Sequence, residues 1–146
     1  MDYCQTERGY TIRLDRGEEI VATLGRFLAE QRISAGALTA IGAVDQAELG
    51  LFSMRDRQYW RRRFDGEYEI VALTGNVTVM DGKPFCHLHI LLSDEDYKVI
   101  GGHLFEARVG VTCEIDLAVY GRELRRSRDE TTTLNLMDFG SGNKGS

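Results

Sequence analysis

Only one stretch of this chain places its apolar residues at helical spacing, and the rest alternates as strands do. Between Glu18 and Gln31 the apolar residues recur three to four positions apart, which predicts an amphipathic helix. Glu18 and Glu19 fall in its first turn, where the helix dipole favours acidic side chains. A single amphipathic helix has to bury its apolar stripe against a sheet. The apolar positions of this helix are Ile20, Val21, Leu24, Phe27 and Leu28.

The segments outside the helix predict a series of strands joined by tight turns. Arg55 and Asp56 separate AELGLFSM from RQYWRRRF, which predicts a hairpin. Gly75 lies inside YEIVALTGNVTVM, where we expect a long strand with a bulge. The sequence therefore predicts an α+β fold with one main helix packed on a largely antiparallel β-sheet. In the last long strand, one face is expected to hold Val109, Val111, Cys113, Ile115, Leu117 and Val119.

The length of the chain, 146 residues, predicts one domain, which we place at residues 1–138 with a disordered tail at 139–146. Cys4, Cys86 and Cys113 are scattered without a Cys-x-x-Cys motif, and free thiols in a reducing cytoplasm explain them best. The polar start has no apolar signal core, and no run of 18 apolar residues occurs. We therefore expect a cytoplasmic protein without a membrane partner.

All three histidines of the chain fall within 17 residues of one another, as His87, His89 and His103. Residues two apart on a strand share a face, so His87 and His89 are expected to point the same way. A hairpin through SDEDYKV would bring His103 alongside, where Gly101 and Gly102 permit a close backbone approach. Three imidazoles without a thiolate leave a fourth position open, which is typical of catalytic zinc. Nickel, cobalt and copper also suit imidazole.

The alternative interpretation is that these are ordinary strand histidines held by hydrogen bonds. Because all three histidines of the chain occur at this spacing, the metal site is favoured. Cys86 is not included in it, because its side chain is expected to face away from the neighbouring histidines. Glu114 and Glu69 are candidates for orienting a histidine or for carrying a proton beside a metal-bound water. A surface or sheet-edge carboxylate is the competing interpretation for each of them.

Two arginine-rich stretches raise the question of nucleic acid. In RQYWRRRF, Arg61, Arg62 and Arg63 are flanked by aromatic residues, and such a pattern can pair phosphates and stack bases. Acidic residues are mixed into both stretches, however, and the net charge of the chain is −5. A solvated or inter-subunit face is therefore favoured over a DNA surface. The second stretch contains Arg122, Arg125, Arg126 and Arg128.

The chain contains three longer stretches with a recognisable pattern, GEEIVATLGRFLAEQRISAGALTAIGAVDQAELG, GEYEIVALTGNVTVMDGKPFCHLHILLSDEDYKVIGGHL and TCEIDL. They resemble the plants-and-prokaryotes-conserved (PPC) domain in its prokaryotic form, and the similarity runs from about Tyr10 to Leu136. The resemblance implies a homotrimer of small α+β subunits in which His87, His89 and His103 bind a metal, typically zinc. It also implies a fold similar to that of acetolactate decarboxylases, zinc enzymes whose ion is held by three histidines.

Members of this family are often described as predicted DNA-binding proteins, and plant members join the domain to AT-hooks. This chain has no Arg-Gly-Arg-Pro hook and keeps a histidine set that plant members tend to lack. The first hypothesis is therefore a metal-binding homotrimer whose open site takes a small carbonyl or carboxylate ligand. An enzyme built on it would be a zinc-dependent lyase, decarboxylase-like, or a hydrolase. The second hypothesis is a DNA-binding regulatory module, and a third is a purely structural metal.

Overall fold

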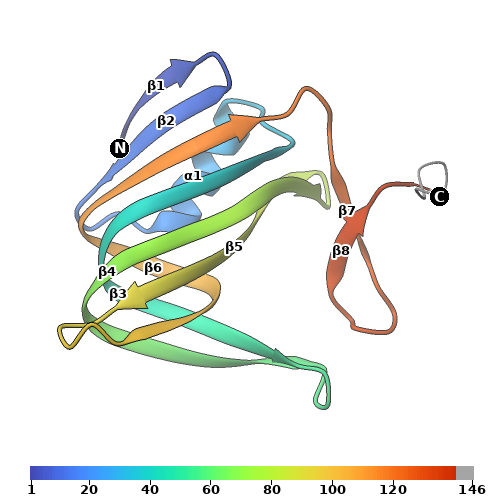
Figure 1. Ribbon diagram of the computed structural model, residues 1–146. Coiled ribbons are helices and arrows are strands. Elements are labelled where there is room, and N and C mark those ends of the chain that lie inside the picture. Colours follow the sequence, from blue (N-terminus) through green and yellow to red (C-terminus); the bar gives the residue numbers. More distant parts are fainter. Residues whose placement is uncertain (141–146) are drawn as a thin grey trace.

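The computed structural model describes residues 1–140 and confirms a largely antiparallel sheet with one helix packed on it (Figure 1). No helix of these residues is long and apolar enough to cross a membrane. The elements in chain order are β1 (Asp2–Thr6), β2 (Gly9–Asp15), α1 (Ile20–Glu30), β3 (Gly36–Ser53), β4 (Gln58–Met80), β5 (Lys83–Ser93), β6 (Val99–Val119), β7 (Arg125–Arg128) and β8 (Asn135–Asp138).

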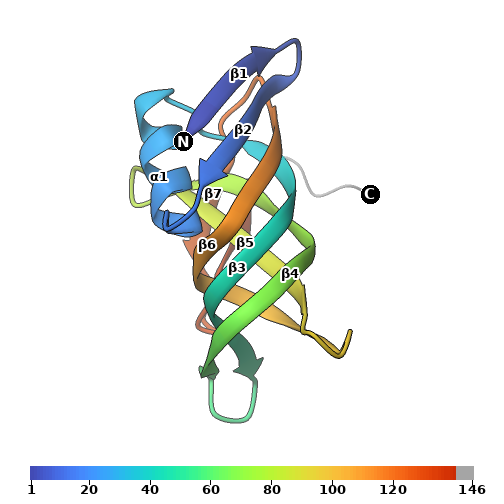
Figure 2. The ribbon, with the colours of Figure 1, turned by 90° about the vertical axis from the view of Figure 1, so that its left-hand side faces the viewer.

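The strands follow the order β1-β2-β6-β3-β4-β7-β8, and β5 pairs with both β4 and β6. Because β6 also pairs with β3, the pairing of β3, β4, β5 and β6 returns on itself. Figure 2 shows β2, β6, β3 and β4 running obliquely beside one another with α1 on one side. The pairs are antiparallel except for the contact of β4 with β7. The closed pairing places β5 directly between β4 and the start of β6.

Helix α1 is shorter than the predicted range of Glu18 to Gln31. Glu19 lies outside the helix as its N-cap, and its carboxylate accepts hydrogen bonds from the backbone N–H groups of Val21 and Ala22. A capping carboxylate satisfies donors that the first turn leaves free, so it marks the boundary of the helix. The buried stripe of α1 is formed by Ile20, Thr23, Leu24, Phe27 and Leu28, which confirms most of the predicted apolar face.

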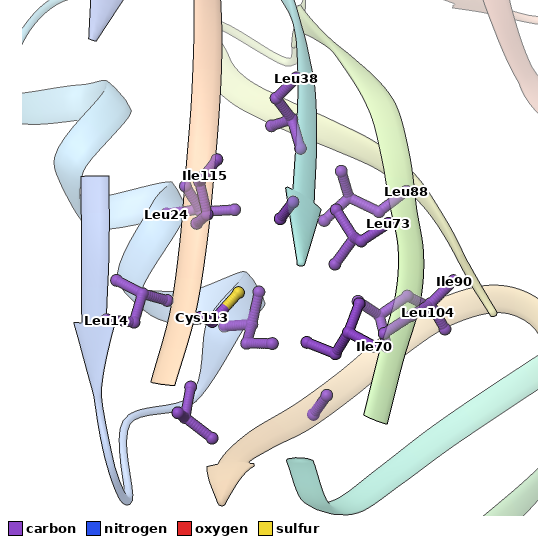
Figure 3. Close-up of a cluster of buried hydrophobic side chains, with 14 of the residues drawn as sticks. Leu14, Leu24, Leu38, Ile70, Leu73, Leu88, Ile90, Leu104, Cys113 and Ile115 are labelled. Atoms are coloured by element: carbon purple, nitrogen blue, oxygen red, sulfur yellow. The ribbon is translucent and has the colours of Figure 1, made fainter. Parts of the chain in front are cut away.

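The hydrophobic core lies between α1 and the strands of the sheet (Figure 3). Phe27 is the largest fully buried side chain, and its ring packs edge-on against Tyr3 and Tyr10 at centroid distances of 5.0 and 5.1 Å. Burial of apolar side chains contributes roughly 25 cal/mol for each Å² removed from water, which makes this cluster the main source of stability. Figure 3 labels Leu14, Leu24, Leu38, Ile70, Leu73, Leu88, Ile90, Leu104, Cys113 and Ile115.

Several predicted strands turn out to be parts of longer ones. AELGLFSM belongs to the longer strand β3, which begins at Gly36, and both RQYWRRRF and YEIVALTGNVTVM belong to β4; the hairpin at Arg55 and Asp56 is confirmed. The predicted bulge at Gly75 is wrong, because Gly75 pairs regularly with Leu88 and the irregularity lies between Ile70 and Ala72. The prediction for Val111 is also wrong. An irregularity in the pairing of β3 with β6 breaks the alternation there and leaves Val111 70% exposed.

Three short strands were not predicted. β1 forms a hairpin with β2, and β7 and β8 pair with each other beside the end of β4, standing apart from the main sheet in Figure 1. Of the predicted tail at 139–146, only Phe139 and Gly140 belong to the described residues. All three cysteines are free, as the sequence predicts. The β7–β8 pair lies next to the histidines, since Nη2 of Arg126 is 3.3 Å from Nδ1 of His87.

Candidate metal centre

The three histidines lie on the antiparallel pair formed by β5 and the start of β6. His89 stands directly opposite His103, and His87 lies two residues earlier on the same face of β5. Leu88 and Ile90, on the other face of β5, are buried in the core. The alternation of β5 therefore turns the imidazoles away from the core, as the spacing in the sequence predicts. Cys86 packs against the core, which confirms that it does not join them.

The distances between the imidazoles match those expected around one ion. Nε2 of His87 and Nε2 of His89 are 3.2 Å apart, and one ligand atom from each of the three residues lies within 4.8 Å of the others. Two nitrogens bound tetrahedrally to zinc at about 2.0–2.1 Å would be roughly 3.3 Å apart. The ring centroids are separated by 5.1, 5.2 and 5.6 Å. The donor set and its spacing therefore fit a divalent transition metal ion.

The nitrogen Nδ1 of His103 is buried and has no hydrogen-bond partner among the described residues. Buried polar atoms are usually paired, so such an atom indicates a missing partner, for which an ion or a water would serve. Tyr59 and Phe105 enclose the His103 ring, with centroids 5.0 and 4.7 Å from it. The aromatic rings exclude solvent from one side of the histidine cluster.

Arg126 of β7 lies beside His87. Its Nη2 is 3.3 Å from Nδ1 of His87 and donates a hydrogen bond to Oδ1 of Asn76 at 2.8 Å. Its Nε donates to Oγ1 of Thr78 at 2.9 Å, and its Nη1 to the carbonyl oxygen of Asn135 at 2.7 Å. These three bonds fix the half-buried guanidinium beside the histidines, and burial lowers its pKa.

Burial sets the protonation of two of the histidines. Burial is the main cause that lowers the pKa of His103 to about 4, and the neighbouring His87 and His89 contribute to the same shift. Burial is also the main cause of the lowered pKa of His87, with Arg126 as the next contribution. Both imidazoles are therefore neutral at neutral pH, which is the form that binds a metal.

The lowered pKa of His103 predicts that the metal-free protein loses stability as the pH falls from about 6.5 towards 4. Within this window the unfolded chain protonates His103 while the folded protein does not, so the unfolded state binds more protons and is favoured. The unfolding temperature after chelator treatment should fall more steeply between pH 7 and pH 5 than that of a His103→Asn variant. Parallel curves for the two proteins would contradict this account.

The two predicted carboxylates are placed away from the histidines. Glu114 is exposed in the half of β6 that pairs with β2, where its neighbour is Arg13. Glu69 is exposed on β4 opposite Ser93, and it lines a separate cavity of about 400 Å³. Among the described residues, the only cluster of possible metal ligands is the three histidines themselves. The structure therefore does not bring Glu114 or Glu69 to the site.

The three consecutive arginines of β4 are already engaged with other residues. Arg61 donates to Oε1 of Glu48 at 3.0 Å and lies over the Phe105 ring, and Arg63 donates to Oδ1 of Asp65 at 3.1 Å. Arg62 stacks on Phe64 instead. Three further residues lie beside the histidines and are not predicted as site residues from the sequence: Arg126, Asn76 and Tyr59. The one sequence signal at Arg126 is its place in a basic stretch, where nothing distinguishes it from the neighbouring arginines.

Comparison with known proteins agrees with this architecture. A metal-containing protein from Archaeoglobus fulgidus is 37% identical with a TM-score of 0.82, over 94% of this chain and 99% of its own. A PPC protein from Pyrococcus horikoshii is 30% identical with a TM-score of 0.84, over 94% of each chain. A proposed DNA-binding protein from Bacteroides thetaiotaomicron is 30% identical with a TM-score of 0.92, over 94% of this chain and 96% of its own.

Fold and site together define a small, mostly β protein with a histidine cluster on one face of its sheet. The chain belongs to the Plants and Prokaryotes Conserved domain family, which matches residues 1–120. Acetolactate decarboxylase from Bacillus subtilis, 17% identical with a TM-score of 0.55 over 75% of this chain and 51% of its own, shares the fold alone. The bifunctional protein GlmU of Synechococcus sp. is 34% identical to this chain over 113 residues. The aligned residues make up 76% of this chain but only 17% of GlmU.

Proposed function

We propose that His87, His89 and His103 bind a divalent transition metal, zinc in the first place, and that the open position takes a small carbonyl or carboxylate ligand. The observation that carries the proposal is the convergence of three ligand atoms within 4.8 Å, two of them at the 3.2 Å expected around one ion. The metal-containing relative from Archaeoglobus supports it. Nickel, cobalt and copper suit the same imidazole ligands.

The residues around the ion would define what it can do. A metal ion held by three imidazoles supplies a Lewis acid that polarises a carbonyl or lowers the pKa of a bound water. Tyr59 and Phe105 would exclude bulk water from the side of His103, and Arg126 would present positive charge beside His87. This arrangement is suited to lyase chemistry of the decarboxylase kind or to hydrolysis, and a screen of small carbonyl and carboxylate compounds with the metal-loaded protein tests both.

The metal content of the purified protein tests the proposed site directly. We expect close to one zinc per chain by mass spectrometry, and almost none in a His87→Ala/His89→Ala double variant, because a single remaining imidazole binds weakly. Lys83→Ala, which removes an exposed side chain from the start of the same strand, serves as the matched control and should keep its metal. Equal metal content in the double variant and the control would rule out the histidine site.

Assembly into a homotrimer is part of the proposal. Ile41 on β3, Val71 on β4 and Leu91 on β5 occupy neighbouring positions of the sheet, and their side chains are 60%, 51% and 46% exposed. A row of exposed apolar side chains favours association of subunits. Light scattering measures the mass of the assembly, and the mass of a single chain at micromolar concentration would contradict the trimer.

A trimer that dissociates or unfolds with a chelator would indicate a structural role for the metal.

DNA binding is the alternative function, suggested by the proposed DNA-binding role of the Bacteroides relative. The pairing of Arg61 with Glu48 and of Arg63 with Asp65 reduces the charge that β4 could offer to phosphates. An affinity for duplex DNA that falls steeply with salt, survives a chelator and is lost in Arg61→Ala/Arg62→Ala/Arg63→Ala would support this alternative. We expect the triple variant and the parent protein to bind DNA equally weakly.

A further inference from the structure

Arg126 is a half-buried cation without an acidic partner among residues 1–140. Every ion pair of the described residues involves other groups, and the oxygens that accept from Arg126 belong to Thr78, Asn76 and a backbone carbonyl. A guanidinium has five N–H groups, and these bonds use three. The second N–H of Nη2 faces Nδ1 of His87 at 3.3 Å, which leaves one N–H on Nη1 free. Arg126 therefore has both charge and donor capacity left for a ligand.

The charge around the histidine cluster is unusual for a metal site. A metal-binding histidine generally donates its second ring N–H to a carboxylate, a carbonyl or a water, whereas Nδ1 of His87 faces a guanidinium. Among the described residues, no Asp or Glu joins the histidine cluster. Glu48 forms an ion pair with Arg61, the arginine that lies over the Phe105 ring. A divalent ion between three neutral imidazoles would add two positive charges beside Arg126. Partly buried charges of one sign need a counter-charge close by.

We propose that the open position of the three-histidine centre is a binding site for a small oxyanion, bound to the metal on one side and to Arg126 on the other. This inference rests on the proposed metal binding and narrows the ligand from any small carbonyl compound to an anion. A carboxylate and an inorganic phosphate share the oxyanion chemistry that a guanidinium and a metal both recognise. The aromatic rings of Tyr59 and Phe105 leave the organic part of a carboxylate an apolar surface to contact.

The competing explanation gives Arg126 a structural role only. Its bond to Asn135 ties the β7–β8 pair together, and its bonds to Asn76 and Thr78 tie that pair to β4. A structural arginine would affect folding and metal retention but would leave the affinity for anions unchanged in any variant that still folds and binds metal. The two roles therefore separate in an experiment that measures anion affinity and metal content independently.

The test uses the full chain loaded with Co²⁺, whose visible absorption reports a change of ligands. Acetate, inorganic phosphate and neutral acetone are titrated separately into the parent protein, Arg126→Gln, Arg126→Lys and the control Arg62→Gln, which removes an exposed arginine that stacks on Phe64. We expect acetate or phosphate, but not acetone, to change the spectrum. The Kd of that anion should rise at least tenfold in Arg126→Gln, stay within about threefold in Arg126→Lys, and be unchanged in Arg62→Gln.

A second variant keeps Arg126 in place and protects the test against misfolding. Asn76→Asp would put a carboxylate where the amide oxygen accepts from Nη2 at 2.8 Å, and this carboxylate would neutralise the guanidinium. Anion affinity should fall at least fivefold while bound cobalt, measured by mass spectrometry, stays near one per chain. If the parent protein binds no cobalt, the proposed function and this inference both fail. Full cobalt with anion affinities that are equal in the parent, Arg126→Gln and Asn76→Asp would overturn this inference alone.

Discussion

Replacing Gly75 with alanine is expected to lower the free energy of unfolding by roughly 3 kcal/mol and to weaken metal binding at least tenfold. Gly75 pairs with Leu88 across β4 and β5, and a Cβ atom there would lie 2.1 Å from the carbonyl oxygen of His87. That oxygen belongs to the backbone, so relief requires β5 to move rather than a side chain to rotate. Forcing extra atoms into a packed region costs about 1–3 kcal/mol, and more where backbone must shift. The same movement displaces His87.

Urea unfolding and metal content measured on the same preparations check this prediction. Gly121→Ala is the matched control, because a Cβ atom at Gly121 would meet nothing within 4 Å. The control should unfold at nearly the same urea concentration as the parent protein and keep its metal. A Gly75→Ala variant that behaves like the Gly121→Ala control would show that β5 tolerates the displacement, and that the position of His87 does not depend on close contact between the two strands.

The parts of the fold that follow from neighbouring residues could be predicted from the sequence. The stripe from Ile20 to Leu28 specifies the buried face of α1, and the polar residues at Arg55 and Asp56 specify the turn between β3 and β4. The spacing of His87 and His89 fixes their common face, because side chains alternate along any strand. These features depend on local periodicity alone, so no knowledge of strand partners was needed.

Strand pairing decided the features that the sequence did not show. Val111 lies in the segment of β6 between the partners of Gly42 and Val44, where three residues oppose one, so simple alternation gives the wrong face. Gly42 itself has a positive φ of 148°, and a Cβ atom there would meet the carbonyl oxygen of Thr112 at 2.1 Å. Contacts of this kind join residues about 70 positions apart, and local pattern carries no information about them.

The candidate site divides in the same way. The regular spacing of the three histidines predicts that they share one face, whereas no spacing ties Glu69 and Glu114 to them, and both lie elsewhere on the sheet. Arg126 reaches His87 only because β7 aligns with the end of β4, where the N–H of Val79 donates to the carbonyl oxygen of Leu124. A four-residue strand with three arginines looks like a solvated surface until its partner is known.

Phe27→Ala is expected to lower the free energy of unfolding by about 3–5 kcal/mol, the range observed when a buried phenylalanine is truncated. The Phe27 ring is 1% exposed, and its removal would leave a cavity bounded by Tyr3 and Tyr10 that a single helix cannot close by shifting. Phe139→Ala removes the same ring from a position that is 61% exposed, and it should change stability by less than about 0.5 kcal/mol. Urea unfolding of both variants measures the difference.

Metal content of the Phe27→Ala variant separates the core from the histidine centre. Phe27 lies in the core, whereas His87 and His89 point away from it on the opposite face of β5. The folded variant should therefore still bind one metal per chain, and added zinc should raise its unfolding temperature as it does for the parent protein, because the ligand binds only the folded state. A variant that folds but has lost its metal would mean that helix packing holds the histidines in place. The centre would then depend on α1 as well as on the β4–β5–β6 pairing.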